Sequence, residues 1–198
     1  MSTSDASNPA TADRSLRGLL LLLATIAGVA VANIYYNQPL LDNLRQSFPN
    51  SASWVGAVPA VTQLGYAAGM LLLAPLGDRF DRRRLILLQI AGMCVALVLA
   101  SAAPTLSVLI VASLAIGVLS TIAQQAVPFA AELAPASQRG HAVGTVMSGL
   151  LLGILLARTA AGIVAEYFGW RAVFGASVVA LLVLAAVIIM RQIGRAHV

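Results

Sequence analysis

The sequence predicts an all-α membrane protein with six transmembrane helices. Of its 198 residues, 60% are hydrophobic and 10% are charged, whereas a soluble domain carries about 25% charged residues. The mean hydropathy is +0.90, so too few polar residues are present to cover a water-soluble surface. Six uncharged runs each approach the roughly 20 residues that a helix needs to cross a bilayer. The surrounding solvent is therefore predicted to be lipid.

Charge, proline or polar clusters bound each of these runs. Pro39 stops the first run and Pro104 closes the third, while the fifth contains Arg158. Helices are favoured over barrel strands because the runs are long and do not alternate. The predicted spans, within a six-helix domain of residues 18–191, are residues 19–37, 54–76, 85–103, 106–131, 142–165 and 172–190.

Residues at both ends of the chain lie outside this predicted domain. Residues 1–17 are predicted to be a disordered cytoplasmic tail. The first run could instead be a secretory signal, but five further spans favour a transmembrane helix. Residues 192–198 look like a translated sequencing adapter, so the native sequence is expected to end near Arg191.

The arginines predict which ends of the helices face the cytoplasm. The chain has no lysine, and arginines in cytoplasmic loops set the orientation of membrane proteins. Eight arginines fall in one set of alternate loops and only two in the other. The larger set, predicted to be cytoplasmic together with the amino terminus, is Arg14, Arg17, Arg79, Arg82, Arg83, Arg84, Arg139 and Arg191; the smaller set is Arg45 and Arg171.

A shift of 88 positions brings out an internal repeat. It lays residues 78–83 over residues 166–171, which gives the pattern acid, any residue, Phe, two residues, Arg in both copies, and it also aligns Gly65 with Gly153. The shift covers three spans, so the two copies would have opposite orientations in the membrane. The sequence therefore predicts two inverted three-helix repeats. Two independent helix-end signals are the alternative interpretation.

The segment from Leu76 to Arg84 resembles the signature loop of the major facilitator superfamily. Leu76, Gly77, Asp78, Arg79, Arg82 and Arg83 match that pattern, whereas Ala74 and Asp81 stand where the family usually has glycine. Residues 33–41 and 169–171 resemble bacterial efflux members of the same superfamily. The resemblance implies the amino-terminal half of a twelve-helix transporter in a bacterial inner membrane, with a missing carboxy-terminal six-helix half as its partner.

The resemblance also implies a role for this loop as a conformational latch. In the family the loop steadies the outward-facing state, partly by pairing an arginine with an acid at the end of the fourth helix. Here that implies a pair between Arg82 and Glu132. The latch residues implied in this way are Gly77, Asp78, Arg79, Arg82, Arg83 and Glu132. The alternative is that the arginines only set topology.

Polar side chains at helical spacing predict a substrate cavity. Asn33, Tyr36 and Asn37 share one face of the first span, and Ser113 and Gln124 lie in a polar stripe of the fourth. Hydrogen bonding between helices would explain them equally well. The resemblance favours a cavity, since the first and fourth helices line it in that fold. The candidate cavity residues are Asn33, Tyr36, Asn37, Gln63, Tyr66, Ser113, Gln124 and Arg158.

Arg158 is the charge placed within a predicted span. An intramembrane charge costs about 2.5–3.5 kcal/mol on insertion scales and usually faces a partner or a cavity. We therefore expect Arg158 to bind an anionic group of a substrate or to pair with a carboxylate; snorkelling to the outer interface is the alternative. In the same span Gly149, Gly153, Ala157 and Ala161 form a small-residue stripe that predicts close helix packing.

No catalytic set, cofactor site, metal site or nucleic-acid-binding feature is evident in the sequence. Proton coupling would need a carboxylate that titrates in the membrane, and the nearest candidates are Asp42, Glu132 and Glu166 at span ends. The predicted function is secondary transport of small organic molecules, with proton-coupled efflux as the favoured mode and no activity for this fragment alone. A non-transporting membrane scaffold or assembly protein is the alternative.

Overall fold

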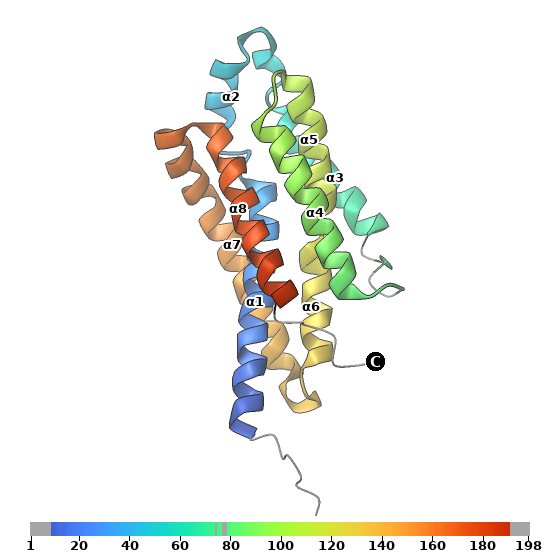
Figure 1. Ribbon diagram of the computed structural model, residues 1–198. Helices are drawn as coiled ribbons and strands as arrows, with labels where there is room; N and C mark the ends of the chain where they lie inside the picture. The colour runs from blue at the N-terminus through green and yellow to red at the C-terminus, as the bar shows by residue number, and fades with distance from the viewer. Residues whose placement is uncertain (1–8, 74, 77–78, 191–198) are drawn as a thin grey trace, which may run out of the picture.

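Helices make up all the regular structure in the described part of the chain (Figure 1). The structure, a computed structural model, describes residues 9–73, 75–76 and 79–190. Its elements are α1 (Pro9–Tyr35), α2 (Leu41–Ser47), the 3-10 helix η1 (Pro49–Trp54), α3 (Ala57–Leu72), α4 (Arg82–Ser101), α5 (Leu106–Leu119), α6 (Ile122–Leu133), the 3-10 helix η3 (Ala136–Gln138), α7 (Arg139–Phe168) and α8 (Trp170–Met190).

The six predicted spans correspond to α1, α3, α4, the pair α5 and α6, α7, and α8. Among the described residues, five helical segments are long and apolar enough to cross a membrane, while α3 has 16 residues. The prediction of 54–76 was too long for this helix, because residues up to Trp54 form η1 and α3 begins at Ala57.

The predicted disordered tail was also wrong in part, since α1 begins at Pro9. Proline suits the first position of a helix, and residues 10–17 contain no glycine or proline to interrupt it. Residues 1–8 and the predicted non-native residues 192–198 lie outside the described residues.

The fourth span is interrupted between α5 and α6, which its hydropathy did not reveal. Ser120 Oγ donates to the carbonyl oxygen of Ile116 at 2.7 Å, and Thr121 Oγ1 donates to that of Val118 at 3.1 Å. Hydroxyls that bond back to their own helix compete with the backbone and often bend it. The interruption turns the start of α6, and with it Gln124, relative to α5.

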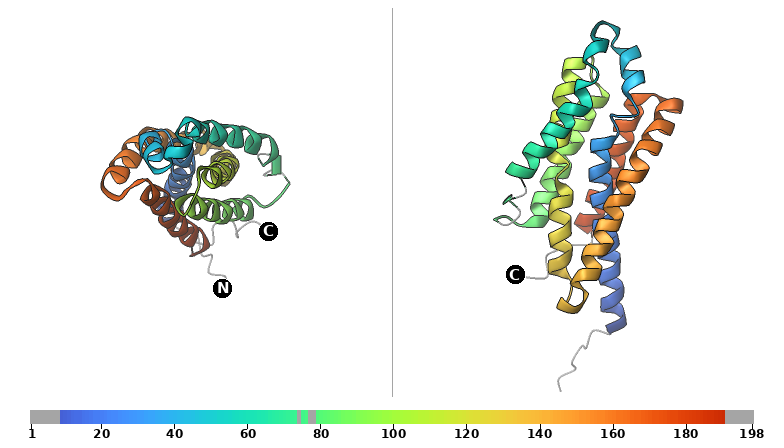
Figure 2. Two further views of the ribbon diagram at one scale, coloured as in Figure 1. Left: turned by 90° about the horizontal axis from the view of Figure 1, so that it is seen from above. Right: turned by 180° about the vertical axis from the view of Figure 1, so that it is seen from behind.

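The helices pack in pairs that follow the predicted repeat. The closest pairs are α1 with α7, α3 with α5, and α4 with α8. A shift by three spans places α1 on the α5–α6 span, α7 on α3, and α4 on α8. The α1–α7 pair then becomes the α3–α5 pair, and the α4–α8 pair maps onto itself. The bundle thus has the pairing expected of two inverted three-helix repeats (Figure 2).

Aligned glycines mark the two equivalent contacts. A Cβ atom on Gly28 of α1 would lie 2.6 Å from the carbonyl oxygen of Gly149 on α7. A Cβ atom on Gly65 of α3 would overlap the carbonyl oxygen of Leu114 on α5, and one on Gly153 would overlap that of Gly28. Backbones can approach this closely only where side chains are absent. The small-residue stripe of the fifth span is therefore a packing surface toward α1.

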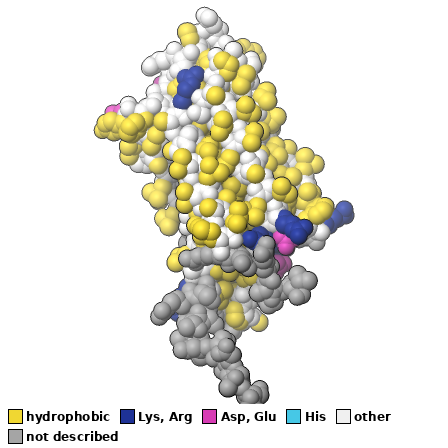
Figure 3. Space-filling view, in the orientation of Figure 1, with side chains coloured by type: hydrophobic (Ala, Val, Ile, Leu, Met, Phe, Trp, Pro, Cys, Tyr) yellow, Lys and Arg dark blue, Asp and Glu magenta, His cyan; other side chains and the backbone are white. Residues whose placement is uncertain are grey.

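The two ends of the bundle differ in charge. In Figure 1 the start of α1 and the turn from α6 to α7 lie at the lower end, and the connection from α3 to α4 lies above them on the lower half of the bundle, whereas α2 and η1 lie at the upper end. The arginines of the α3–α4 connection and Arg139 are in the lower half, and Arg45 and Arg171 are at the upper end. Figure 3 shows that hydrophobic side chains cover the face between these ends.

A cluster around Trp170 holds the upper end together. Trp170 Nε1 donates to Ser47 Oγ at 2.9 Å, and the Trp170 ring packs against those of Phe48 and Phe174. The Arg171 guanidinium lies 4.2 Å from the Trp170 ring centroid and donates to the Ala103 carbonyl oxygen at 2.9 Å. The start of α8 is thereby tied both to α2 and to the α4–α5 turn.

We expect Arg171→Ala to lower the melting temperature by about 2–8 °C. The variant loses a charge-assisted hydrogen bond and a cation–π contact, together about 1–2 kcal/mol, and about 1 kcal/mol corresponds to about 2–4 °C for a chain of this size. Thermal unfolding in detergent, followed by circular dichroism, measures the shift. The matched control is Arg45→Ala, whose exposed 2.7 Å pair with Asp42 is worth about 0–1 kcal/mol. Equal shifts in the two variants would contradict the proposed tie.

Candidate functional site

A group of polar side chains lies where α1 packs against α3, α5 and α6. We call this group the polar seam. Asn33, Asn37, Thr62 and Ser113 are buried in it, and Tyr66 and Gln124 are half-buried. A Cβ atom on Gly117 would meet the backbone of Thr62 and Tyr66, which places the face of α5 that carries Ser113 against this part of α3. The seam consists of Asn33, Asn37, Thr62, Tyr66, Ser113 and Gln124.

The hydrogen bonds of Asn37 fix the orientation of its amide. Thr62 Oγ1 donates its hydrogen to the Val58 carbonyl oxygen at 2.8 Å, so toward Asn37 it can only accept. Asn37 Nδ2 donates to it at 2.8 Å. The amide oxygen of Asn37 is therefore turned away from Thr62, and it has no hydrogen-bond partner among the described residues.

Asn33 is held in the same way by its own helix. Its Nδ2 donates to the Val29 carbonyl oxygen at 2.7 Å, and a carbonyl can only accept. Within the described part of the chain, the Asn33 amide oxygen is buried without a partner, as is Ser113 Oγ. Burying a polar group without a hydrogen bond costs about 1–3 kcal/mol. The seam therefore offers acceptors that a donor from outside the described chain would satisfy.

Gln124 closes the seam below the interruption in the fourth span. Gln124 Nε2 donates to the Tyr66 hydroxyl at 2.9 Å, and its Oε1 is buried with no partner in the residues described. Its backbone N–H donates to the Thr121 carbonyl oxygen at 3.0 Å. The turn between α5 and α6 thus positions Gln124 beside α3.

Other polar side chains in the bundle serve packing. Gln89 of α4 donates to Thr121 Oγ1 at 3.0 Å, and Gln125 donates to the Leu73 carbonyl oxygen at 3.1 Å. Both contacts join helices, and both glutamines are buried. The amide oxygen of Gln89 nevertheless has no partner in the described part of the chain.

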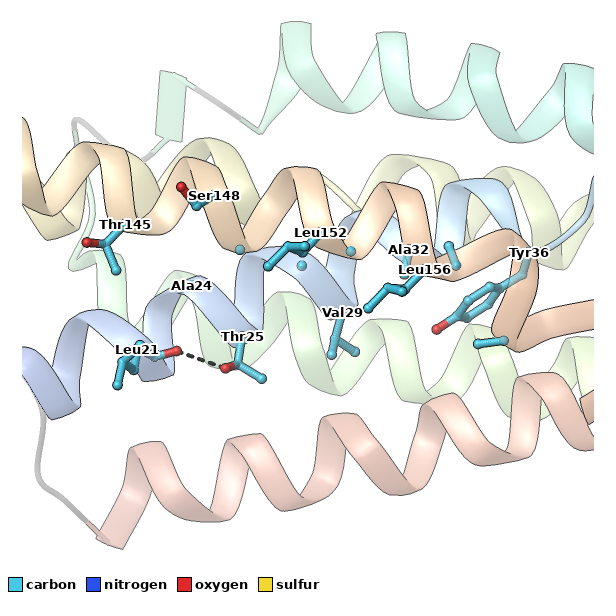
Figure 4. A pocket seen from close by; sticks show the side chains of 15 residues that line it. Leu21, Ala24, Thr25, Val29, Ala32, Tyr36, Thr145, Ser148, Leu152 and Leu156 are labelled. Atoms are coloured by element: carbon cyan, nitrogen blue, oxygen red, sulfur yellow. Dashed lines mark hydrogen bonds between the residues drawn. The ribbon is translucent and has the colours of Figure 1, made fainter. Parts of the chain in front are cut away.

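Five of the eight candidate cavity residues lie in the seam, and three do not. Gln63 is exposed on α3, whereas its neighbour Thr62, which the sequence analysis missed, faces inward. Tyr36 lines a groove between α1 and α7 (Figure 4) and is hydrogen-bonded to Ser177. Arg158 is exposed on α7, with its guanidinium 5.8 Å from the Tyr35 ring centroid.

The α3–α4 loop brings two of the implied latch residues together. Arg82 Nη1 lies 3.2 Å from Glu132 Oε1, which joins the start of α4 to the end of α6. The Glu132 side chain is 60% exposed, whereas that of Arg82 is only 14% exposed. The acid end of the pair therefore faces water while the guanidinium lies largely within the protein.

Asp81, which stands where the family usually has glycine, has a structural role as the N-cap of α4. Asp81 Oδ1 accepts from the backbone N–H of Arg84 at 2.7 Å and so caps α4, which explains an aspartate there. Arg79 is exposed and Arg83 half-buried. Gly77 and Asp78 lie outside the described residues.

Comparison with known proteins identifies the family. Residues 20–196 match the Major Facilitator Superfamily. The chain belongs to this superfamily. Members of this superfamily are transporters rather than enzymes. The match confirms the resemblance, and the helical structure confirms the predicted fold class.

Curated relatives in the superfamily carry several names. The chain is 46% identical over 167 residues to the uncharacterized transporter YgaY of Escherichia coli O157:H7, covering 84% of this chain and 42% of YgaY. It is 32% identical to the D-xylose transporter of Levilactobacillus brevis (71% of this chain, 32% of the relative) and 30% identical to the multidrug resistance protein MdtG of Proteus mirabilis (61% and 30%). The chain thus spans less than half the length of these relatives.

Solved structures share the fold of this superfamily chain. A D-xylose–proton symporter matches with a TM-score of 0.74 and 19% identity, covering 86% of this chain and 47% of the symporter. A bacterial homologue of the human lysosomal transporter Spinster, in an inward-facing state, matches with a TM-score of 0.66 and 16% identity, covering 85% and 42%. The described helices therefore correspond to about half of a transporter fold.

Proposed function

We propose that the chain forms the amino-terminal half of a proton-coupled exporter of small organic molecules in a bacterial inner membrane. It would work by alternating access together with a carboxy-terminal six-helix half, and it would not transport alone. Its amino terminus would lie in the cytoplasm, as the arginine distribution favours. The polar seam would form its wall of the substrate path.

The observation that carries this proposal is the set of unpartnered acceptors in the seam. The buried amide oxygens of Asn33, Asn37 and Gln124 lack donors in the described part of the chain. The Gln89 amide oxygen on α4 is also buried without a described donor, so one such atom is not distinctive; the seam differs because three of them gather on neighbouring helices. A passenger molecule with hydroxyl or amino groups, or water that accompanies it, would supply donors.

The loop at the lower end would set the balance between conformations. The Arg82–Glu132 pair joins α4 to α6 at one end of the bundle, so its loss on rocking would free these two helix ends from each other. Gly77, Asp78, Arg79 and Arg83 belong to the proposed latch through the family resemblance. The latch would stabilise the state in which the cytoplasmic side is closed.

The proton-carrying acid is proposed to lie beyond the described residues. Asp42, Asp81, Glu132 and Glu166 are all exposed at helix ends, and Asp42 and Glu132 already face arginines. A proton carrier would have to lie within the membrane-spanning part of the bundle, whereas these carboxylates lie at its ends. The other half of the transporter is the expected place for it.

Asn37→Leu tests the role of the seam. We expect the complete transporter that contains this chain to lose at least about tenfold in transport rate, because one hydrogen bond to the passenger, worth about 1.4 kcal/mol, is removed. Uptake of ethidium, D-xylose and benzoate into everted vesicles supplies a cationic, a neutral and an anionic probe.

Asn50→Leu is the matched control for that experiment. Asn50 is exposed in η1 at the upper end, outside the seam, so its replacement should leave transport unchanged. Unaltered transport of every probe by the folded Asn37→Leu protein would show that the seam only joins helices. Loss of transport in both variants would also count against a specific role for Asn37.

A further inference from the structure

One hollow on the surface of the bundle is separate from the polar seam. It is a groove of about 610 Å³ between α1 and α7, lined by 15 residues. Among the seam and candidate cavity residues only Tyr36 lines it. We propose that this groove binds one acyl chain of an anionic phospholipid, whose phosphate contacts Arg17 and His141. This proposal holds whether or not the chain transports.

The walls of the groove select an apolar occupant. Two threonines and one serine line it, and each donates to its own helix: Thr25 to Leu21, Thr145 to His141 and Ser148 to Gly144, at 2.8–2.9 Å. The remaining lining is aliphatic or glycine apart from Tyr36 (Figure 4). A hydrocarbon chain fits such walls, whereas a sugar or an ion would lose its hydration without compensation.

The length of the groove suits an acyl chain. Its lining runs along α1 from Leu21 to Tyr36, about 22 Å at 1.5 Å per residue, while one leaflet of the hydrocarbon core is about 15 Å thick. Val29, Tyr36 and Ala160 also line a second hollow, of about 210 Å³, that extends under α8. A chain entering from the lower end could therefore follow the groove through the whole leaflet.

Charge at the lower mouth selects the headgroup. Arg17 precedes Leu21, and His141 precedes Thr145, each by one helical turn on the groove-facing side. Both side chains are exposed. Because α1 and α7 run in the same direction and pack against each other, these residues lie at similar depth. Arg17 and His141 would therefore reach the phosphate group of a lipid in the leaflet on the arginine-rich side of the membrane. Basic pockets between helices on that side bind anionic headgroups.

Native mass spectrometry of the purified chain tests the proposal. The chain is exchanged into mixed micelles with phosphatidylglycerol or phosphatidylcholine of identical acyl chains. We expect one phosphatidylglycerol to be retained in preference to phosphatidylcholine. Arg17→Ala should reduce retention of phosphatidylglycerol about fivefold, the effect of one basic group near a membrane surface, and Arg17→Lys should restore most of it.

Side chains that fill the groove should reduce the retention of phosphatidylglycerol and of phosphatidylcholine alike. Thr25→Phe and Ser148→Phe place a ring in the groove at exposed positions whose hydroxyls contact only their own helix, so retention of both lipids should fall. Val111→Phe and Arg84→Ala are matched controls on α5 and α4, outside the groove. Equal retention of the two lipids, loss in the control variants alone, or dimers in place of lipid adducts would overturn the proposal.

Discussion

Gly65→Leu is expected to abolish formation of the folded bundle. A Cβ atom at this position would overlap the carbonyl oxygen of Leu114, and backbone cannot move aside as a flexible side chain does. The α3–α5 contact would have to open by several ångströms, since a leucine needs the space now occupied by helix backbone. Size-exclusion chromatography after detergent extraction should show aggregate in place of the monodisperse peak.

Gly162→Leu is the control for this experiment. Nothing lies within 4 Å of a Cβ atom built on Gly162 of α7, so the same change adds the same apolar volume without a clash. The protein should then extract and elute as the unaltered chain does. Gly153→Leu, at the position aligned with Gly65, should repeat the Gly65 result. A monodisperse Gly65→Leu protein would contradict the described α3–α5 contact.

Hydropathy and loop charge predicted most of the fold because the lipid bilayer constrains both the apolar length of each span and the placement of charged loops. A helix must be long and apolar to cross the bilayer, so the spans could be located to within a few residues, with the start of α1 and the length of α3 as exceptions. The interruption at Ser120 and Thr121 was missed because it arises from hydroxyl-to-backbone bonds that leave the hydropathy unchanged.

The candidate site was harder to predict because adjacent polar residues point in different directions. Thr62 and Gln63 are separated by about 100° around a helix, and only packing decides which of them faces inward. One signal was available: Thr62 shares a face with Gly65 and Gly69, the small residues that contact α5. That spacing marks the buried side of α3 and would have placed Thr62 in the seam instead of Gln63.

Arg158→Leu is expected to abolish transport by the complete protein without reducing membrane insertion. Removing the charge lowers the insertion cost by about 2.5–3.5 kcal/mol, so the amount of inserted protein should stay equal or rise. Arg158 is exposed on α7, and no described carboxylate lies within ion-pair distance of it. The described contact of its guanidinium is the Tyr35 ring at 5.8 Å.

The pattern of loss distinguishes two roles for this arginine. If Arg158 binds an anionic group of the passenger, Arg158→Leu should stop transport of benzoate and spare that of ethidium. If it pairs with a carboxylate of the other half, transport of every probe should fall together, and Arg158→Lys should restore it because the charge returns. Unchanged transport of all probes would leave snorkelling to the outer interface as the explanation that fits, because Arg158 lies about 7 Å from the middle of the predicted span toward the outer face at 1.5 Å per residue. An exposed charge on this face would then be tolerated by the bilayer alone, with no contribution to the substrate path.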